Sequence, residues 1–206
     1  MKLAAQNTCI HMQRASKFTA YQFGWCKQVK AELLVTSVGE DRPGIVAQLT
    51  EVFVKHGANL EESRMAILGG EFAAIMLTTL PEDKVPALQN ALSKLKDEGI
   101  TITTKVTRRA EPPKGFTQYT LVLSGADHEG IVHNVAARLR DKKVNIESLE
   151  TEVINAPLSG IPLFTMKATL QAPAGLRVED LRSSLAEIAN AESVDIELQS
   201  AAAGVR

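Results

Sequence analysis

The sequence is poor in cysteine and aromatic residues, and it has no long apolar run. Only two of its 206 residues are cysteines, and both lie within the first 30 positions, so we expect neither a disulfide framework nor a cysteine-based metal site in the rest. Aromatic residues make up 4%, which leaves no stacking platform for single-stranded nucleic acid. No apolar run approaches the roughly 18–20 residues that cross a bilayer. The hydrophobic content of 45% still suffices for ordinary globular cores.

The first 30 residues differ from the rest in charge. They hold five of the 23 basic residues and none of the 24 acidic ones, so the remaining chain has a net charge of −6. Such a segment is typical of an organelle transit peptide; the alternatives are an upstream extension from a misplaced start codon and a disordered tail. We exclude residues 1–30 from the fold and treat residues 201–206 as a tail. The acidic remainder argues against direct binding to nucleic acid, which requires a basic footprint.

A short sequence occurs twice, 86 positions apart. Residues 39–46 read GEDRPGIV, and residues 125–132 read GADHEGIV. The match continues at the same spacing in Asn59 and Asn145, and later in two helical stripes of spacing 3, 4, 3. These stripes are Val85, Leu88, Leu92 and Leu95, and then Val178, Leu181, Leu185 and Ile188. A match in both turns and helix faces predicts a tandem repeat, with a longer hairpin loop near 155–162 in the second copy.

Each copy predicts the same order of elements. In the first copy, residues 32–38 and 100–106 are apolar and rich in β-branched residues, which favours strands, and apolar stripes favour helices between them. The unit is βαββαβ, the ferredoxin-like split βαβ. We therefore predict an α+β fold of two ferredoxin-like domains in tandem, each an antiparallel four-stranded sheet with two helices on one face. The domains span residues 31–109 and 115–200, with a Pro-rich linker at 110–114.

The repeated turn contains the candidate ligand site. Asp41 and Asp127 lie between a strand and a helix, where an acid ordinarily caps the helix and where free N–H groups attract a carboxylate. Gly44 and Gly130 each cost roughly 0.5–1 kcal/mol against alanine in a first helical turn. Two explanations for these glycines stay open, namely close packing against a strand and the approach of a ligand to the main chain.

The residues between the repeated Asp and Gly differ from one copy to the other. Pro43 and Glu129 both suit a first helical turn, because proline pre-sets φ and glutamate complements the helix dipole. Arg42 in the first copy is replaced by His128 in the second. The turn therefore keeps its shape-determining residues and changes its basic one.

The motif D-R-P-G-I-V (41–46), followed by N-L-E (59–61) in a βαββαβ unit, resembles the ACT domain, a small amino-acid-sensing module. The stretch EESRMAILGGEFAAIMLTTLP (61–81) and the two-unit layout are similar to the family of the glycine cleavage system transcriptional repressor. The resemblance covers residues 32–199. It implies a non-catalytic cytoplasmic regulator without cofactor, which binds a small amino acid, with glycine as the first candidate.

The same resemblance implies control of transcription through a protein partner such as an activator, with no direct contact to nucleic acid or membrane. Two alternatives stay open: a free-standing ACT regulatory subunit of a metabolic enzyme, and an interaction scaffold that binds no ligand. Formation of a homodimer also stays open, as does import into an organelle if residues 1–30 are a transit peptide.

The resemblance further implies where a ligand binds. The first strand ends at the opposite edge of the sheet from the start of the second, so Asp41 and Asn59 of one domain are not expected to share a ligand. In ACT domains similar to the one on phosphoglycerate dehydrogenase, side-by-side units bring the turn of one to the asparagine of the other. The expected ligand residues are Asp41, Arg42, Pro43, Gly44 and Ile45 with Asn145, and Asp127, His128, Gly130 and Ile131 with Asn59. Serine is disfavoured, because a serine-sensing ACT domain has a histidine where this chain has Gly39 and Gly125.

No catalytic or metal-binding residues are expected. The fold also hosts acylphosphatases, which use an arginine in the first turn, but Arg42 precedes a proline and has His128 as its counterpart. The copper-chaperone version of the fold requires a cysteine pair, and residues 31–206 contain no cysteine. The histidines His56, His128 and His133 lack the spacing of metal ligands.

Overall fold

The computed structural model of the chain describes residues 29–108, 115–155 and 162–200. Several predicted features lie outside these residues: the leader up to residue 28, the linker, the tail and nearly all of the longer hairpin loop. The chain divides into two compact units, Met1–Ala110 and Glu111–Arg206, which are called unit 1 and unit 2 below. Each unit is described by itself.

Both units contain the predicted order of strands and helices. The elements of unit 1 are β1 (Lys30–Glu40), α1 (Ile45–Lys55), β2 (Asn59–Leu68), β3 (Glu71–Pro81), the short 3-10 helix η1 (Glu82–Lys84), α2 (Val85–Ser93), a second 3-10 helix η2 (Lys94–Glu98) and β4 (Ile100–Thr107). The elements of unit 2 are β5 (Phe116–Ala126), α3 (Ile131–Asp141), β6 (Asn145–Asn155), β7 (Pro162–Pro173), α4 (Val178–Glu192) and β8 (Val194–Ser200).

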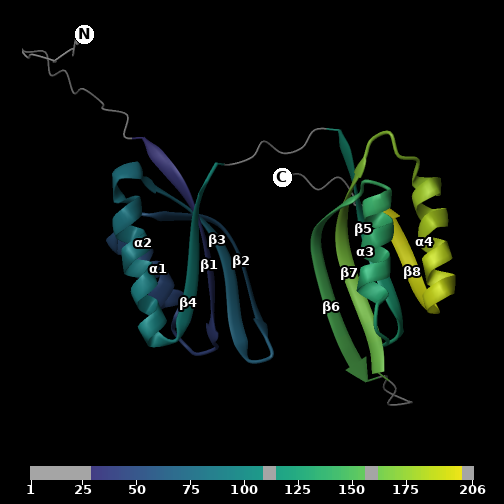
Figure 1. Ribbon diagram of the computed structural model, residues 1–206, viewed down its shortest axis with the longest axis horizontal. Coiled ribbons are helices and arrows are strands. Elements are labelled where there is room, and N and C mark those ends of the chain that lie inside the picture. The colour runs from purple at the N-terminus through teal and green to yellow at the C-terminus, as the bar shows by residue number, and fades with distance from the viewer. Residues whose placement is uncertain (1–28, 109–114, 156–161, 201–206) are drawn as a thin grey trace, which may run out of the picture. The chain divides into compact units, whose positions relative to one another are not determined.

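Each unit is one antiparallel sheet with its helices on one face (Figure 1). The strand order is β2-β3-β1-β4 in unit 1 and β6-β7-β5-β8 in unit 2. The first and third strands lie in the middle of each sheet, and the second strand forms an edge. The predicted fold class, two ferredoxin-like α+β domains in tandem, is confirmed.

Alternating burial along the strands explains why the sheets have one covered face. In β1, the side chains of Leu33, Val35 and Ser37 are buried, while their neighbours in the strand are more exposed. The predicted 3-4-3 stripe of unit 1 is buried along its whole length, from α2 into η2. Its counterpart on α4 buries three of its four residues and packs the fourth, Val178, against the same core. Strand period and helix period thus place apolar side chains on facing surfaces.

The two units differ in the second helical segment. In unit 1, α2 changes to the 3-10 helix η2, whereas α4 is a single α-helix. A 3-10 helix rises about 2.0 Å per residue against about 1.5 Å for an α-helix, so the unit 1 segment spans a similar length with one residue fewer. Each segment ends on a glutamate, Glu98 or Glu192, just before a residue with left-handed φ, Gly99 or Ser193. The two acids therefore occupy equivalent places.

Candidate ligand site

The repeated turn is tied to the start of the third strand in both units. In unit 1, the main-chain N–H of Asp41 donates to the carbonyl oxygen of Gly70 at 3.0 Å. In unit 2, the N–H of Asp127 donates to the carbonyl oxygen of Pro162 at 3.4 Å. Both acids therefore lie at the end of the sheet where the second strand finishes and the third begins.

Gly44 and Gly130 are the N-cap residues of α1 and α3, not members of a first helical turn. Their φ angles are 94° and 96°, in the left-handed region where residues with a Cβ are strained. A Cβ built on Gly44 would meet nothing within 4 Å, and one on Gly130 would make an ordinary 3.6 Å contact with Asn134. Close packing is therefore the wrong explanation, and the left-handed main chain accounts for both glycines without a ligand.

The expected helix-capping role of the two turn acids is also wrong. No side-chain hydrogen bond caps α1 or α3, because the N-cap glycine stands three residues after Asp41 and Asp127. Pro43 and Glu129 precede the N-caps, so neither belongs to a first helical turn. Among the described residues, the Asp41 carboxylate makes no hydrogen bond or ion pair. This carboxylate is therefore available to a ligand.

Close packing instead explains the glycine that precedes each turn, Gly39 in unit 1 and Gly125 in unit 2. A Cβ on Gly39 would lie 2.8 Å from the carbonyl oxygen of Gly99, and one on Gly125 would lie 2.5 Å from Cγ1 of Val194. Both glycines face the helices, beside the start of the fourth strand. A histidine at these positions has no room, which strengthens the sequence argument against a serine-type site.

The two repeated asparagines lie at the far end of the sheet from the turns. On β3, Phe72 pairs with Gly39 beside the turn, whereas Thr79 pairs with Asn59. Seven residues of extended strand span roughly 23 Å. Asn145 stands in the same place in unit 2, opposite Gln171. Asp41 and Asn59 of one unit thus lie far apart, as expected, and the pairing of turn and asparagine across units stays a prediction.

A hollow of about 630 Å³ lies beside the turn of unit 1. Its walls come from the turn, from the first residues of α1, and from the ends of β2 and β3 that face them. Four of the five turn residues expected to bind a ligand line it, and these are Asp41, Arg42, Gly44 and Ile45. The structure thus brings these four residues together around one space, and Pro43 is not among the lining residues.

In each unit, a chain of polar side chains connects the turn to the end of the second helical segment. In unit 1, Nη2 of Arg42 donates to Oε1 of Gln48 at 2.6 Å. The Nε2 group of Gln48 in turn donates to Oε2 of Glu98. A base of the turn, an amide of the first helix and a terminal acid are thereby joined.

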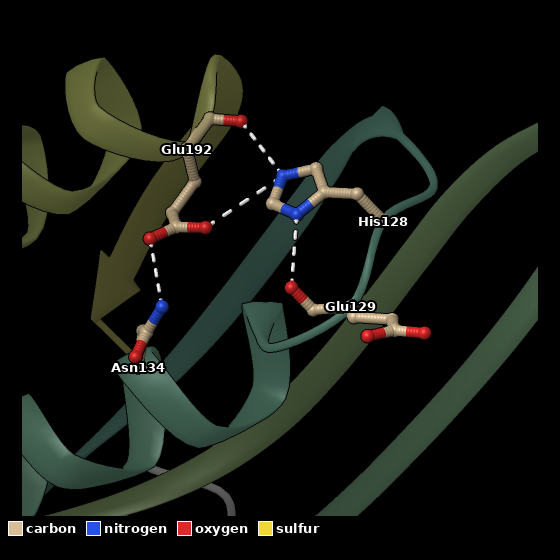
Figure 2. A network of polar contacts seen from close by, with 4 residues as sticks. All are labelled: His128, Glu129, Asn134 and Glu192. Carbon is tan, nitrogen blue, oxygen red and sulfur yellow. Dashed lines mark hydrogen bonds and ion pairs between the residues drawn. The ribbon is translucent and has the colours of Figure 1, made fainter.

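Unit 2 contains the same chemistry in different residues (Figure 2). Nδ2 of Asn134 donates to Oε1 of Glu192 at 2.8 Å. The Nε2 atom of His128 lies 3.0 Å from the main-chain oxygen of Glu192 and 3.6 Å from its Oε2 atom. The turn base, helix amide and terminal acid recur, although all but the acid have changed identity.

The geometry around His128 favours its protonated form. Its Nδ1 atom lies 3.2 Å from the carbonyl oxygen of Glu129, so both ring nitrogens face acceptors. Only the imidazolium form donates from both nitrogens. The main-chain carbonyls of Glu192 and Glu129, in that order, raise the pKa of His128 above its ordinary value. Desolvation of the ring opposes this rise, and the negative charges of Glu192 and Asp127 add to it by smaller amounts.

Comparison with known proteins places this arrangement in a family. The ACT domain model matches residues 31–106. The crystal structure of an unknown protein from Galdieria sulphuraria is similar to this chain, with 34% sequence identity and a TM-score of 0.72. The match covers 84% of this chain and 100% of the Galdieria chain. The chain is thus an ACT-domain protein, with the matched domain in unit 1. The chain is also 28% identical over 144 residues to the glycine cleavage system transcriptional repressor of Escherichia coli (strain K12). This match covers 69% of this chain and 75% of the repressor. Family and relative support a regulatory, amino-acid-sensing role.

Sequence reasoning missed several residues that contact one another beside the two turns. The amides of Gln48 and Asn134 and the acids Glu98 and Glu192 complete the two polar chains. Gln48 and Asn134 are 86 positions apart, like the turns, and this spacing is the signal that could have found them. The acids carry no such signal, because the longer hairpin loop of unit 2 and the change of helix type together shift their spacing.

The described parts of the ACT chain hold no group of three or more histidine, cysteine, aspartate or glutamate side chains placed to bind a metal ion. None of the helices described is both long enough and apolar enough to span a membrane.

Proposed function

We propose that this ACT protein controls transcription of glycine metabolism by binding a small amino acid and changing its affinity for a protein partner such as an activator. The hollow at the turn of unit 1 carries the proposal, because four expected ligand residues meet around it. The name of the Escherichia coli relative supports the role in transcription and makes glycine the first ligand to test.

The open face of the sheet in unit 2 supports a protein partner over direct contact with DNA. Four exposed acids lie on this face in two rows across the strands: Glu150 and Glu197, and Glu152 and Asp195. One base, Lys167, lies in the first row between the acids. Such a surface repels phosphates and attracts a basic surface of another protein.

Regulation requires that the ligand binds two states of the protein with different affinity. The polar chains support a route for this effect, because each connects its turn to the end of the second helical segment. A ligand that displaces Arg42 from Gln48 would break the link between the turn and Glu98. The surface of the helices would then report occupancy of the turn.

We propose that the protein acts without catalysis. In unit 1 the turn base Arg42 is bonded to Gln48, and in unit 2 both ring nitrogens of His128 face main-chain carbonyls. A group engaged in this way holds a loop in place, and neither arrangement sets a nucleophile beside a base.

The test combines a ligand screen with partner capture. Calorimetry on the full chain with each proteinogenic amino acid should find at least one that binds, with a melting temperature that rises with its concentration. A tagged chain, purified from its own cells with and without that amino acid, should retain a transcriptional activator in one condition only. Retention of a metabolic enzyme would support the regulatory-subunit alternative, and absence of any amino-acid binding would support the ligand-free scaffold.

A further inference from the structure

The walls of the unit 1 hollow are apolar over most of their extent. Ile45 and Val46 contribute from α1, Met65 and Ile67 from β2, and Phe72 from β3. Ile67, Val46 and Met65 are 59%, 40% and 37% exposed, so three large apolar side chains on two elements converge on one open space. The volume of about 630 Å³ lies within the usual range for small-molecule sites.

One edge of the hollow carries a pair of opposite charges. Asp41 and Arg42 are adjacent and both line it. Among the described residues the Asp41 carboxylate has no partner, and the Arg42 guanidinium bonds only to Gln48, which uses one of its five N–H groups. An acid and a base side by side match the ammonium and carboxylate of a free amino acid. A peptide segment within a protein carries neither charge.

We propose that this hollow binds a free α-amino acid with an apolar side chain of the size of leucine or methionine. The side chain lies against Met65, Ile67 and Phe72, and the two charged groups of the ligand meet Asp41 and Arg42. This inference rests on the proposed function, and it specifies the ligand class at the turn of unit 1. Glycine, which lacks a side chain, leaves the apolar walls exposed to water.

The equivalent place in unit 2 has different chemistry. The strand registers match Met65 with Thr151, so a polar residue replaces one of the large apolar lining residues. Unit 2 has the buried Met166 at the position of Ala74 in unit 1. The larger side chain of Met166 fills the core next to Thr151. The turn of unit 2 is therefore not expected to select an apolar side chain.

Calorimetry on the full chain tests the inference with three probes: L-leucine, glycine, and leucine capped at both ends as N-acetyl-leucinamide. Leucine should bind at least about tenfold more tightly than glycine, because several methylene groups leave water. The capped probe should bind at least about tenfold more weakly than leucine, because it carries neither charge.

Two variants and a control locate the binding. Met65→Thr introduces the residue of unit 2 and should weaken leucine binding about tenfold. Leu68→Thr is the matched control on the same strand, since Leu68 is 72% exposed, does not line the hollow and should leave leucine binding unchanged. Asp41→Asn keeps the shape of the turn and should weaken leucine but not the capped probe.

Equal affinity for leucine and glycine overturns the inference and leaves the proposed function standing. Equal effects of Met65→Thr and Leu68→Thr overturn it as well. Tight binding of the capped probe would show a docking surface for protein segments instead. Failure of every amino acid to bind removes the proposed function itself.

Discussion

The Nε2 atom of His128 lies 3.0 Å from the main-chain carbonyl oxygen of Glu192, 64 residues further along the chain. This contact joins the repeated turn of unit 2 to the last residue of α4. In unit 1, Arg42 reaches the equivalent acid, Glu98, through Gln48. The two turns are thus tied to the same place in the fold, by a permanently charged base in one unit and by a titratable one in the other.

The stability of the protein should depend on pH through His128. Because the folded state raises the pKa of this side chain, its contribution is fully present below the ordinary pKa of histidine and is lost as the pH rises through the raised value. The melting temperature, measured at about pH 5.5 and about pH 8.5, should fall less with pH in His128→Gln than in the native chain. His133→Gln, an exposed histidine on α3, is the control. An equal pH dependence in both variants contradicts the role given to His128.

Glu192→Ala should destabilise the chain more than Glu187→Ala. Glu192 accepts from Asn134 and lies beside His128, with 17% of its side chain exposed, whereas Glu187 pairs with Arg138 and is 66% exposed. Loss of the Glu192 side chain leaves the Asn134 amide without its acceptor and removes the negative charge beside His128. This should cost on the order of 1 kcal/mol, against a few tenths for an exposed ion pair. Urea denaturation measures the difference, and equal losses would show that the polar chain adds no stability.

Gly44→Ala should lower stability by about 1–2 kcal/mol, because a Cβ is strained in the left-handed conformation although nothing lies in its way. Gly44→Asn should recover part of this loss, since asparagine tolerates that conformation better. Gly39→Ala places a Cβ 2.8 Å from a main-chain oxygen and should cost more than either. Denaturant melts rank the three variants. If Gly44→Asn were the least stable of the three variants, the left-handed conformation would not be the reason for glycine at this position.

The pairing of each turn with the asparagine of the other unit can be tested by coupling. If Asp41 and Asn145 contact one ligand, Asp41→Asn and Asn145→Ala should each weaken binding by tenfold to about a hundredfold, and their effects should not add. Asn59→Ala is the control and should leave the affinity of the Asp41 site unchanged. Calorimetry on the single and double variants decides the matter, and additive effects would show that the two residues serve separate sites.

Ser37 and Thr78 make a matched pair in the core of unit 1. Among the described residues, the buried Ser37 hydroxyl has no hydrogen-bond partner, whereas that of Thr78 donates to the carbonyl oxygen of Leu33 at 3.0 Å. Ser37→Ala should therefore raise the free energy of unfolding by about 1 kcal/mol, and Thr78→Val should lower it by about 1 kcal/mol. Chemical denaturation measures both, and a loss in Ser37→Ala would reveal a hydrogen bond that this hydroxyl makes in solution.

The sequence by itself determined the architecture of this protein. The strand of Leu33 and Val35 and the helix of Leu88 and Leu92 follow from periods of burial that each segment carries locally. The repetition of the turn added that the same unit occurs twice. Those signals sufficed because secondary structure and core faces depend on neighbours only a few residues away.

Tertiary structure decided what surrounds the predicted turn. The residue type of Gly44 allowed a helical, a close-packed or a left-handed conformation, and the path of the chain into α1 selected the last. The space beside Gly39 depends on Gly99, and the bond from Gln48 spans 50 residues to Glu98. The hollow likewise needs β2 and α1 side by side. The 86-residue spacing between Gln48 and Asn134 marks these two residues but not their partners, because contacts between segments far apart in the sequence leave no pattern in either segment. Only the folded chain could bring these groups together.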